Sequence, residues 1–263
     1  MRLLMVGAGN MGGAMLRCWL DGGMPASDVT VVSPSGRTMP AGVHVVSAIP
    51  DARTARFDAI MLGLKPQQVG TLRDGPLSDH APGVLISILA GVEEATLASL
   101  CAAATVVRAM PNLPVAIGKG VVALHSSTAD DSVRAALTTL MQPLGLVEWI
   151  ADEARFDDVT ALAGCGPGFV FRFADALAQA GAALGLPVDQ AARLALATLE
   201  GAAIMAREEE ATPAILADRV ASPGGSTRQG LNVLDRDQAL VALLTETLAA
   251  SARRNREMAA ASR

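Results

Sequence analysis

The stretch VGAGNMGGAML, Val6–Leu16, decides the fold of the N-terminal half. Its glycines have the spacing G-x-G-x-x-G, directly after an apolar run typical of a strand and at the start of a helical run. In this context the first glycine permits a tight turn, the second lets the backbone approach a pyrophosphate, and the third allows close helix–strand packing. The helix N-terminus favours the negative charge of a phosphate. The stretch therefore predicts dinucleotide binding by Gly7, Ala8, Gly9, Asn10, Met11 and Gly12.

Short apolar runs alternate with helical runs through the first 150 or so residues. The predicted strands are Leu3–Val6, Val29–Ser33, Val43–Val46, Ala59–Leu64, Val84–Leu89, Thr105–Ala109 and Val121–Leu124, and the predicted helices are Met11–Leu20, Val92–Ala103 and Asp131–Leu140. Continuous apolar runs such as VLISIL predict strands buried on both faces, as in a parallel sheet covered by helices. The pattern predicts an α/β, Rossmann-like domain with a mostly parallel, doubly wound sheet over residues 1–150.

Strand-like runs end after about Ile150, and long alanine-rich helical runs follow. The last predicted helix extends from about Asp237 to Met258. The sequence therefore predicts an all-α domain over residues 151–263. Its helices carry many small side chains and few aromatic ones, so each buries little apolar area alone. We expect this domain to form a homodimer, and the sequence leaves open a larger assembly.

Composition excludes several classes of protein. The 263-residue chain is 51% hydrophobic and 18% charged, which argues against disorder, and its formal charge of −5 argues against a nucleic-acid partner. The opening MRLLMVGAG is too short for a secretory signal, and no apolar run reaches the roughly 20 residues that span a membrane. The expected location is the cytoplasm. The three cysteines are far apart and show no metal-ligand spacing, so no metal site is expected.

The segment after the second predicted strand indicates the choice of cofactor. NAD-binding versions of the motif usually carry a carboxylate about 20 residues on, where it bonds the ribose 2′-hydroxyl. Here the sequence is VVSPSGR, which supplies Ser33, Ser35 and Arg37 and no carboxylate. Guanidinium and hydroxyl groups would bind a 2′-phosphate that an acid would repel. We therefore predict a preference for NADP(H), with NAD(H) possible; the alternative is a solvated Arg37 beside a Ser-Pro turn.

Three further segments lie at or near strand ends, and the carboxyl ends of strands line the ligand crevice in such folds. LGLKP places Lys65 near the phosphates or ribose, LAG approaches the nicotinamide side, and Asn112 in MPNLP is expected to order its turn through bonds to the backbone. The cofactor contacts predicted here are Leu64, Lys65, Pro66, Ala90, Gly91 and Asn112.

Six motifs, in order, resemble those of pyrroline-5-carboxylate reductases. They are GAGNMG, LKP, LAG, RAMPNLP, VTALAGCGPGF and VASPGGSTRQGLNVLD, and together they cover nearly the whole chain. The resemblance implies reduction of the cyclic imine 1-pyrroline-5-carboxylate to L-proline, the last step of proline synthesis, with hydride delivered from NAD(P)H to the imine carbon. It also implies a helical C-terminal domain that intertwines with a partner's domain.

The resemblance also implies site residues. The loop within VASPGGSTRQGLNVLD would bind the carboxylate of the imino acid, with Thr227 as the catalytic hydroxyl near the ring nitrogen. Glu153 and Glu210 match glutamates near the substrate pocket of relatives. The substrate contacts implied are Ser222, Gly224, Gly225, Ser226, Thr227, Glu153 and Glu210.

The chain departs from the family pattern at several positions. Cys165 and Phe169 replace the usual Ser and Tyr, and the segment from Arg37 to Val43 is too short for the usual helix. An Asn that relatives place near the position of Pro50 or Asp51 to contact the adenosine is missing. These departures put the geometry at the adenine end in question.

Two other functions remain open from the sequence. One is a reductase of a different cyclic imine or of a hydroxyacid, and the other is a non-catalytic NADP-binding regulator. The related β-hydroxyacid dehydrogenases use a lysine in their second domain, whereas the only lysines here are Lys65 and Lys119. The intact loop around Thr227 argues against a regulator, because a sensor of the cofactor alone needs no imino-acid site.

Overall fold

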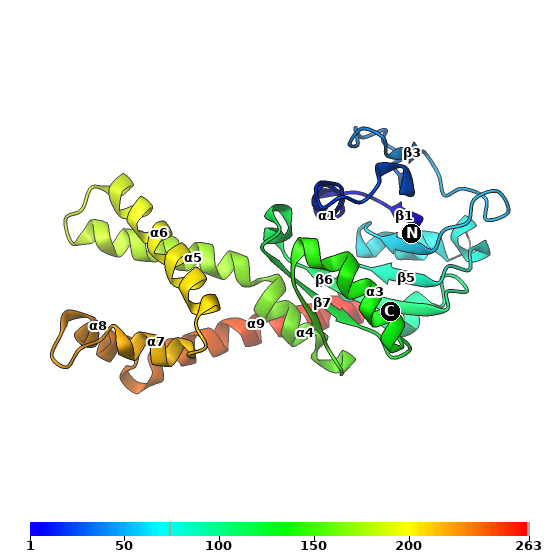
Figure 1. Ribbon diagram of the computed structural model, residues 1–263. Helices are drawn as coiled ribbons and strands as arrows, with labels where there is room; N and C mark the ends of the chain where they lie inside the picture. The colour runs from blue at the N-terminus through cyan, green and yellow to red at the C-terminus, as the bar shows by residue number, and fades with distance from the viewer. Residues whose placement is uncertain (74, 262–263) are drawn as a thin grey trace. The chain divides into compact units, whose positions relative to one another are not determined.

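The computed structural model describes residues 1–73 and 75–261 (Figure 1). The chain divides into two compact units. The first comprises Met1–Cys165 together with the segment that begins at Ser251, and the second comprises Gly166–Ala250.

An eight-stranded sheet forms the centre of the first unit. Its strands are β1 (Leu3–Val6), β2 (Val29–Val32), β3 (His44–Val46), β4 (Ala59–Leu62), β5 (Val84–Ser87), β6 (Thr105–Pro111), β7 (Gly120–His125) and β8 (Gly145–Trp149). The spatial order is β3-β2-β1-β4-β5-β6-β7-β8, and neighbouring strands are parallel except for the antiparallel pair β6 and β7. The predicted α/β class with a mostly parallel sheet is confirmed.

Strand β1 shows why this sequence forms a sheet covered on both faces. Leu3 and Met5 belong to an apolar core that includes residues of helices α1 (Asn10–Asp21) and α3 (Asp131–Met141). Leu4 and Val6 belong to a second core, which includes Leu97 of helix α2 (Glu94–Ala98). All four side chains are buried, because alternate residues of a strand point to opposite faces.

Strand β8 was not predicted. Its residues alternate between partly buried and exposed positions, as expected for an edge strand, so it lacks the continuous apolar run of the central strands. It begins at Gly145, whose φ of +132° is accessible to glycine and rarely to other residues. The predicted helix Val92–Ala103 is also shorter than expected, since regular α-helix covers only Glu94–Ala98.

The second unit is helical. It contains α5 (Gly166–Ala183), α6 (Val188–Glu208), α7 (Pro213–Arg219), α8 (Ser226–Leu234) and the first half of α9 (Ala239–Ala261). No residue of α5 is buried, and α6 buries only Ala191 and Ala195. Within the described ranges, the structure contains no helix that combines the length and the apolar character needed to cross a membrane.

The compact units differ from the predicted division at residue 150. Helix α4 (Phe156–Val159) packs in the first unit, where Phe156 is buried beneath the guanidinium of Arg108, 4.3 Å from its ring centroid. The end of α9 also belongs to the first unit, and Asn255 Nδ2 donates to the carbonyl of Asp157 at 3.4 Å. A boundary at residue 150 would separate Phe156 from its contacts with Arg108 and His125.

Candidate active site

A cavity of about 730 Å³ lies at the carboxyl edge of the sheet. Its walls come from the segments that follow the adjacent strands β1 to β5, and the first turn of α1 completes it. The residues around it include Gly7, Gly9, Asn10, Met11, Gly12, Pro34, Ser47, Gly63, Leu64, Lys65 and Ile88. Ligands bind at this edge in open α/β sheets, so the cavity is the candidate cofactor site.

Three glycines shape the floor of the cavity in different ways. Gly7 has a φ of +89°, and a Cβ there would lie 3.1 Å from the backbone of Gly63. A Cβ on Gly63 would in turn lie 2.6 Å from the carbonyl oxygen of Gly7. A Cβ on Gly9 would meet no protein atom within 4 Å. The first two glycines therefore let two backbone segments approach, whereas Gly9 keeps open the space that a ligand would enter.

Helix α1 points its N-terminus at the cavity. Gly9 is the N-cap, and no side chain of the described residues caps the helix there. The first amides of the helix, those of Asn10, Met11 and Gly12, therefore remain free to bind an anion, and the helix dipole favours one.

Arg37 lies beside the glycine motif. Its Nη1 donates to the carbonyl of Ala8 at 3.3 Å, and its backbone amide donates to Ser33 Oγ at 3.1 Å. Ser33 is buried, whereas Ser35 lies in the exposed turn between them. The segment after Arg37 contains no helix before β3 begins. The structure thus places the Arg37 guanidinium at Ala8 and the Ser33 hydroxyl at the Arg37 amide.

The other predicted cofactor contacts lie partly at the cavity and partly in other segments. Leu64 and Lys65 line the cavity, while the side chain of Pro66 lies outside the described residues. Ala90 and Gly91 lie in the turn after β5, where a Cβ on Gly91 would lie 3.2 Å from the backbone of Ala259.

Asn112 is buried, and both the oxygen and the nitrogen of its side-chain amide form hydrogen bonds to backbone groups. Its Oδ1 accepts from the amide of Val121 at 2.8 Å, and its Nδ2 donates to the carbonyl of Ala163 at 3.0 Å. These bonds order the turn after β6, as expected from the Pro-bounded sequence.

Several cavity residues were missed from the sequence. They lie at or after the ends of the predicted strands Val43–Val46 and Ala59–Leu64, and they include Ser47, Ala48, Ile49, Gly63, Gln68 and Thr71. Their place in the sequence could have identified them, because the residues that follow β1 to β5 all lie at the same edge of the sheet.

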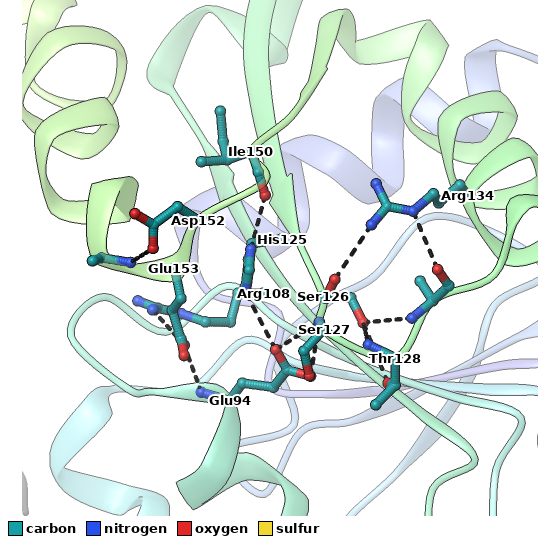
Figure 2. A network of polar contacts seen from close by, with 12 residues as sticks. Glu94, Arg108, His125, Ser126, Ser127, Thr128, Arg134, Ile150, Asp152 and Glu153 are labelled. Carbon is teal, nitrogen blue, oxygen red and sulfur yellow. Dashed lines mark hydrogen bonds and ion pairs between the residues drawn. The ribbon is translucent and has the colours of Figure 1, made fainter.

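Glu153 takes part in a polar network within the first unit, and Figure 2 shows its members. Its Oε1 accepts from Arg108 Nη1 at 2.8 Å and from the backbone amide of Glu94 at 2.8 Å. The carboxylate of Glu94 accepts from the amide and the hydroxyl of Ser127 and lies 3.3 Å from His125 Nε2. Sequence reasoning included Glu153 but none of these partners.

Burial affects the carboxyl group beside this network. Burial raises the pKa of Asp157, and the nearby guanidinium groups of Arg108 and Arg256 oppose the rise.

Glu94, His125 and Glu153 each offer an atom that could hold a metal ion, and these atoms lie within 4.8 Å of one another. Arg108 already pairs with Glu153, so an ion there would have to compete with the guanidinium.

The second unit contains the predicted substrate loop. The loop joins α7 to α8, and Gly224 has a φ of +74° that requires glycine. Gly225 is the N-cap of α8, and among the described residues no side chain caps that helix. Ser226 and Thr227 form its first turn and are exposed, while Ser222 accepts from the amide of Gly225 through its carbonyl at 3.0 Å. Glu210 lies in the exposed turn between α6 and α7.

Comparison with known proteins gives the family. A family model described as pyrroline-5-carboxylate reductase dimerisation matches residues 153–258. A pyrroline-5-carboxylate reductase of Pseudomonas aeruginosa is 33% identical, over 98% of this chain and 97% of that protein. One from Aquifex aeolicus is 34% identical, over 89% of each chain. This chain belongs to the pyrroline-5-carboxylate reductase family. The resemblance inferred from the six motifs is confirmed.

Solved structures of pyrroline-5-carboxylate reductases have the same fold. The enzyme from Coxiella burnetii superposes with a TM-score of 0.83 at 28% identity, and each chain is covered to 97%. The enzyme from Plasmodium falciparum, solved with NADP bound, superposes with a TM-score of 0.80 at 25% identity, and each chain is covered to 98%.

One departure from the usual pyrroline-5-carboxylate reductase pattern has a contact of its own. Cys165, at the position of the usual Ser, accepts a hydrogen bond from Ser251 Oγ at 3.2 Å. The sulfur thus joins the GCGP turn to α9 within the first unit.

Proposed function

We propose that this chain reduces 1-pyrroline-5-carboxylate to L-proline, with NADPH held in the cavity at the carboxyl edge of the sheet. The observation that carries the proposal is the uncapped glycine turn at the start of α8, in a chain of this family. A small ligand with one carboxylate fits such a turn, because glycine keeps side chains away from the amides.

The first unit would hold the cofactor through backbone groups and one guanidinium. The free amides at the start of α1 would bind the pyrophosphate, and Gly9 would leave room for it. Arg37, together with Ser33 and Ser35, would bind the 2′-phosphate. NADPH, when bound, supplies the hydride that reduces the C=N carbon.

The second unit would orient the substrate. The amides of Gly224 and Ser226 would bind the carboxylate, because the amide of Gly225 already donates to the carbonyl of Ser222. Thr227 Oγ1 would hold the proton at the ring nitrogen, which receives the electron pair of the C=N bond. A protonated imine is already a strong electrophile, so positioning supplies most of the acceleration, of the order of 7–11 kcal/mol in favourable cases. Glu153 and Glu210 remain predicted substrate contacts, although Glu153 Oε1 already binds Arg108.

An assay of the purified protein tests the reaction. We expect oxidation of NADPH that depends on 1-pyrroline-5-carboxylate and forms L-proline in equal amount, and NADP-dependent oxidation of proline at high pH. Turnover of another cyclic imine or of a hydroxyacid in place of this substrate would favour the first alternative. Soluble protein that binds NADPH, turns over none of these compounds and fails to rescue a proline auxotroph would favour a regulator.

Replacing Arg37 with alanine tests the choice of cofactor. A charge-assisted hydrogen bond contributes about 1.5–3 kcal/mol, so the Kd for NADPH should rise about 10- to 100-fold while the Kd for NADH changes little. Titration of protein fluorescence or calorimetry measures both constants. Equal losses for the two cofactors would show that Arg37 supports the glycine motif through Ala8 instead of binding the 2′-phosphate.

We also propose that the helical unit forms a homodimer, which could assemble further. Its helices expose large apolar side chains that a monomer would leave in water, including Val170, Phe171, Phe173, Leu196, Ile204, Val241 and Leu243. Two apolar cores lie in the first unit, and helices α5 and α6 bury almost nothing of their own. Pairing with a second copy would remove these faces from water.

Light scattering after size exclusion should therefore give a mass of at least two chains at micromolar concentration. Combining Phe171→Glu with Phe173→Glu should produce a monomer, since burying each phenyl group contributes about 1.5–3 kcal/mol and a buried carboxylate costs more. Unchanged NADPH affinity would show that the first unit stays folded. A native protein that is monomeric at this concentration would contradict the proposal.

A cytoplasmic location and the absence of nucleic-acid and membrane partners stay predictions. Cell fractionation checks the location, and the expected result is recovery of the chain with cytoplasmic enzymes.

A further inference from the structure

A second cavity, of about 510 Å³, lies at the amino edge of the sheet. Its walls are segments that lead into β4 and β5, whereas the cofactor cavity is built from residues that follow the strands. Among the described residues, none lines both cavities. Small-molecule sites typically have volumes of about 300–1,000 Å³, so this cavity has the size of a ligand site. Its lining includes Arg56, Phe57, Asp58, Asp79, His80 and Pro82.

Backbone hydrogen bonds fix both walls of this second cavity. The amide of Val84 donates to the carbonyl of Asp58 at 3.2 Å, which joins the two walls where the strands begin. The carbonyl of His80 accepts from the amide of Ala102 at 3.2 Å, and the amide of His80 donates to the carbonyl of Leu77 at 3.0 Å. The cavity is therefore part of the bonded edge of the sheet.

His80 has a ring nitrogen that is available to a ligand. The residue is only 4% exposed, and its Nε2 lies 2.9 Å from the carbonyl oxygen of Pro50. A carbonyl oxygen only accepts, so Nε2 donates, and in the neutral ring Nδ1 is then an acceptor. Within the part of the chain that the structure describes, no group bonds Nδ1, although both backbone groups of His80 are bonded. Because His80 lines the cavity, Nδ1 can accept a hydrogen bond from a molecule bound there.

Three charged residues line the same cavity. Arg56 forms no ion pair with the described acids, and no described donor bonds the carboxylate of Asp79. Asp58 accepts a backbone amide through Oδ2 at 2.7 Å, which leaves its other oxygen available. By contrast, Arg53 in the same turn as Arg56 is paired with an acid at 2.6 Å and does not line the cavity. The cavity thus offers one guanidinium and two carboxylates.

Apolar groups form the rest of the lining. Phe57 lies 6.0 Å from the ring of His80, and the guanidinium of Arg2 lies 5.7 Å from the Phe57 centroid. Pro82 is buried, and two alanines complete the walls. A ligand with both charged and apolar parts therefore matches this lining.

We propose that the second cavity binds a small α-amino acid with an apolar side chain. An ammonium group has three N–H donors, and the cavity offers acceptors on three residues, Asp58, Asp79 and His80. The guanidinium of Arg56 matches the carboxylate, which a guanidinium binds through two parallel hydrogen bonds. The side chain of the ligand would pack against Phe57. The inference is independent of the proposed reaction, because the site shares no residue with the cofactor cavity or the substrate loop among the described residues.

Calorimetric titration of the full chain with L-leucine tests the site. We expect one equivalent per chain to bind with a Kd below about 1 mM. N-acetyl-L-leucine lacks the ammonium group and 3-methylbutylamine lacks the carboxylate, so each should bind at least about tenfold more weakly than L-leucine. No saturable binding of L-leucine up to about 10 mM, or equal binding of the three compounds, would overturn the inference.

Two neighbouring arginines supply a matched pair of variants. Arg56→Gln should weaken L-leucine binding about 10- to 100-fold, the effect of losing hydrogen bonds to a charged group. Arg53→Gln makes the same change of charge in the same turn but outside the cavity, so its Kd should match wild type. Asp79→Asn, on the opposite wall, should weaken binding about tenfold and keeps the test decisive if Arg56→Gln does not fold. Equal Kd values for Arg56→Gln and Arg53→Gln would refute the proposed site.

Nitrogen-15 spectra of the histidine rings locate the bound ligand in the wild-type protein. The chain has only three histidines, so their ring signals can be assigned one by one. L-leucine should shift the Nδ1 signal of His80 and leave those of His44 and His125 unchanged. Gly225→Val, which covers the proposed substrate turn, should bind L-leucine as wild type does. Loss of binding in that variant, or an unchanged His80 signal at saturation, would place L-leucine elsewhere and overturn the inference.

Discussion

Replacing Gly9 with alanine is expected to weaken NADPH binding about 100-fold and to leave the fold intact. A Cβ at this position meets no protein atom within 4 Å, so the change introduces no clash in the protein itself. It does fill space beside the first amides of α1, where the pyrophosphate is proposed to bind. Overpacking costs about 1–3 kcal/mol, and each weakened bond to a charged group costs about 1.5–3 kcal/mol. Calorimetric titration with NADPH measures the loss.

Gly63→Ala is the matched control within the same cavity. Its Cβ would lie 2.6 Å from the carbonyl oxygen of Gly7, so backbone must move, and the free energy of unfolding should fall by about 1–3 kcal/mol. Gly9→Ala should change the free energy of unfolding by less than about 0.5 kcal/mol. Full NADPH affinity in Gly9→Ala would show that the pyrophosphate does not approach this glycine.

Replacing Gly225 with valine is expected to reduce kcat/KM for 1-pyrroline-5-carboxylate about 100- to 1000-fold. The new side chain would lie at the start of α8, where a Cβ is 2.6 Å from Ser222 Oγ and 3.1 Å from the Ser222 carbonyl oxygen. It would therefore push the Ser222 hydroxyl aside and cover the amides that are proposed to bind the carboxylate. Loss of one well-placed donor to a developing or bound anion has an effect of this size. Steady-state kinetics with both substrates measures it.

Two controls accompany the Gly225 variant. Its Kd for NADPH should match wild type, because the cavity lies in the other compact unit. Its thermal unfolding should also change little, because Gly225 is partly exposed and its φ of −73° suits any residue. Wild-type turnover in this variant would remove the substrate loop from the proposed function.

The central strands were predictable because they are buried on both faces. A strand such as β5 contains only residues that suit a packed core, and this pattern appears in the sequence without knowledge of the neighbours. Strand β8 and the short helix α2 lack such a signal. Their formation depends on pairing with β7 and on the bonds of Glu94, which join residues distant in the chain.

The cofactor cavity was predictable where residues follow one another along the chain. The turn after β1 and the first turn of α1 are one continuous motif, so Gly7 to Gly12 were found together. Gly63 was missed because its role is set by the carbonyl of Gly7 on the neighbouring strand. The network of Glu153 was missed for the same reason, since Arg108 and His125 meet only through antiparallel register.

The sequence by itself determined the α/β class, the glycine motif and the family, because each depends on the order and spacing of neighbouring residues. The tertiary structure decided which unit contains Phe156 and the end of α9, which glycines are needed for packing, and which acids are paired. The physical reason is that steric contact and charge pairing act over a few ångströms in space. Residues such as Glu94 and Ser127 come within that range only after the sheet has formed.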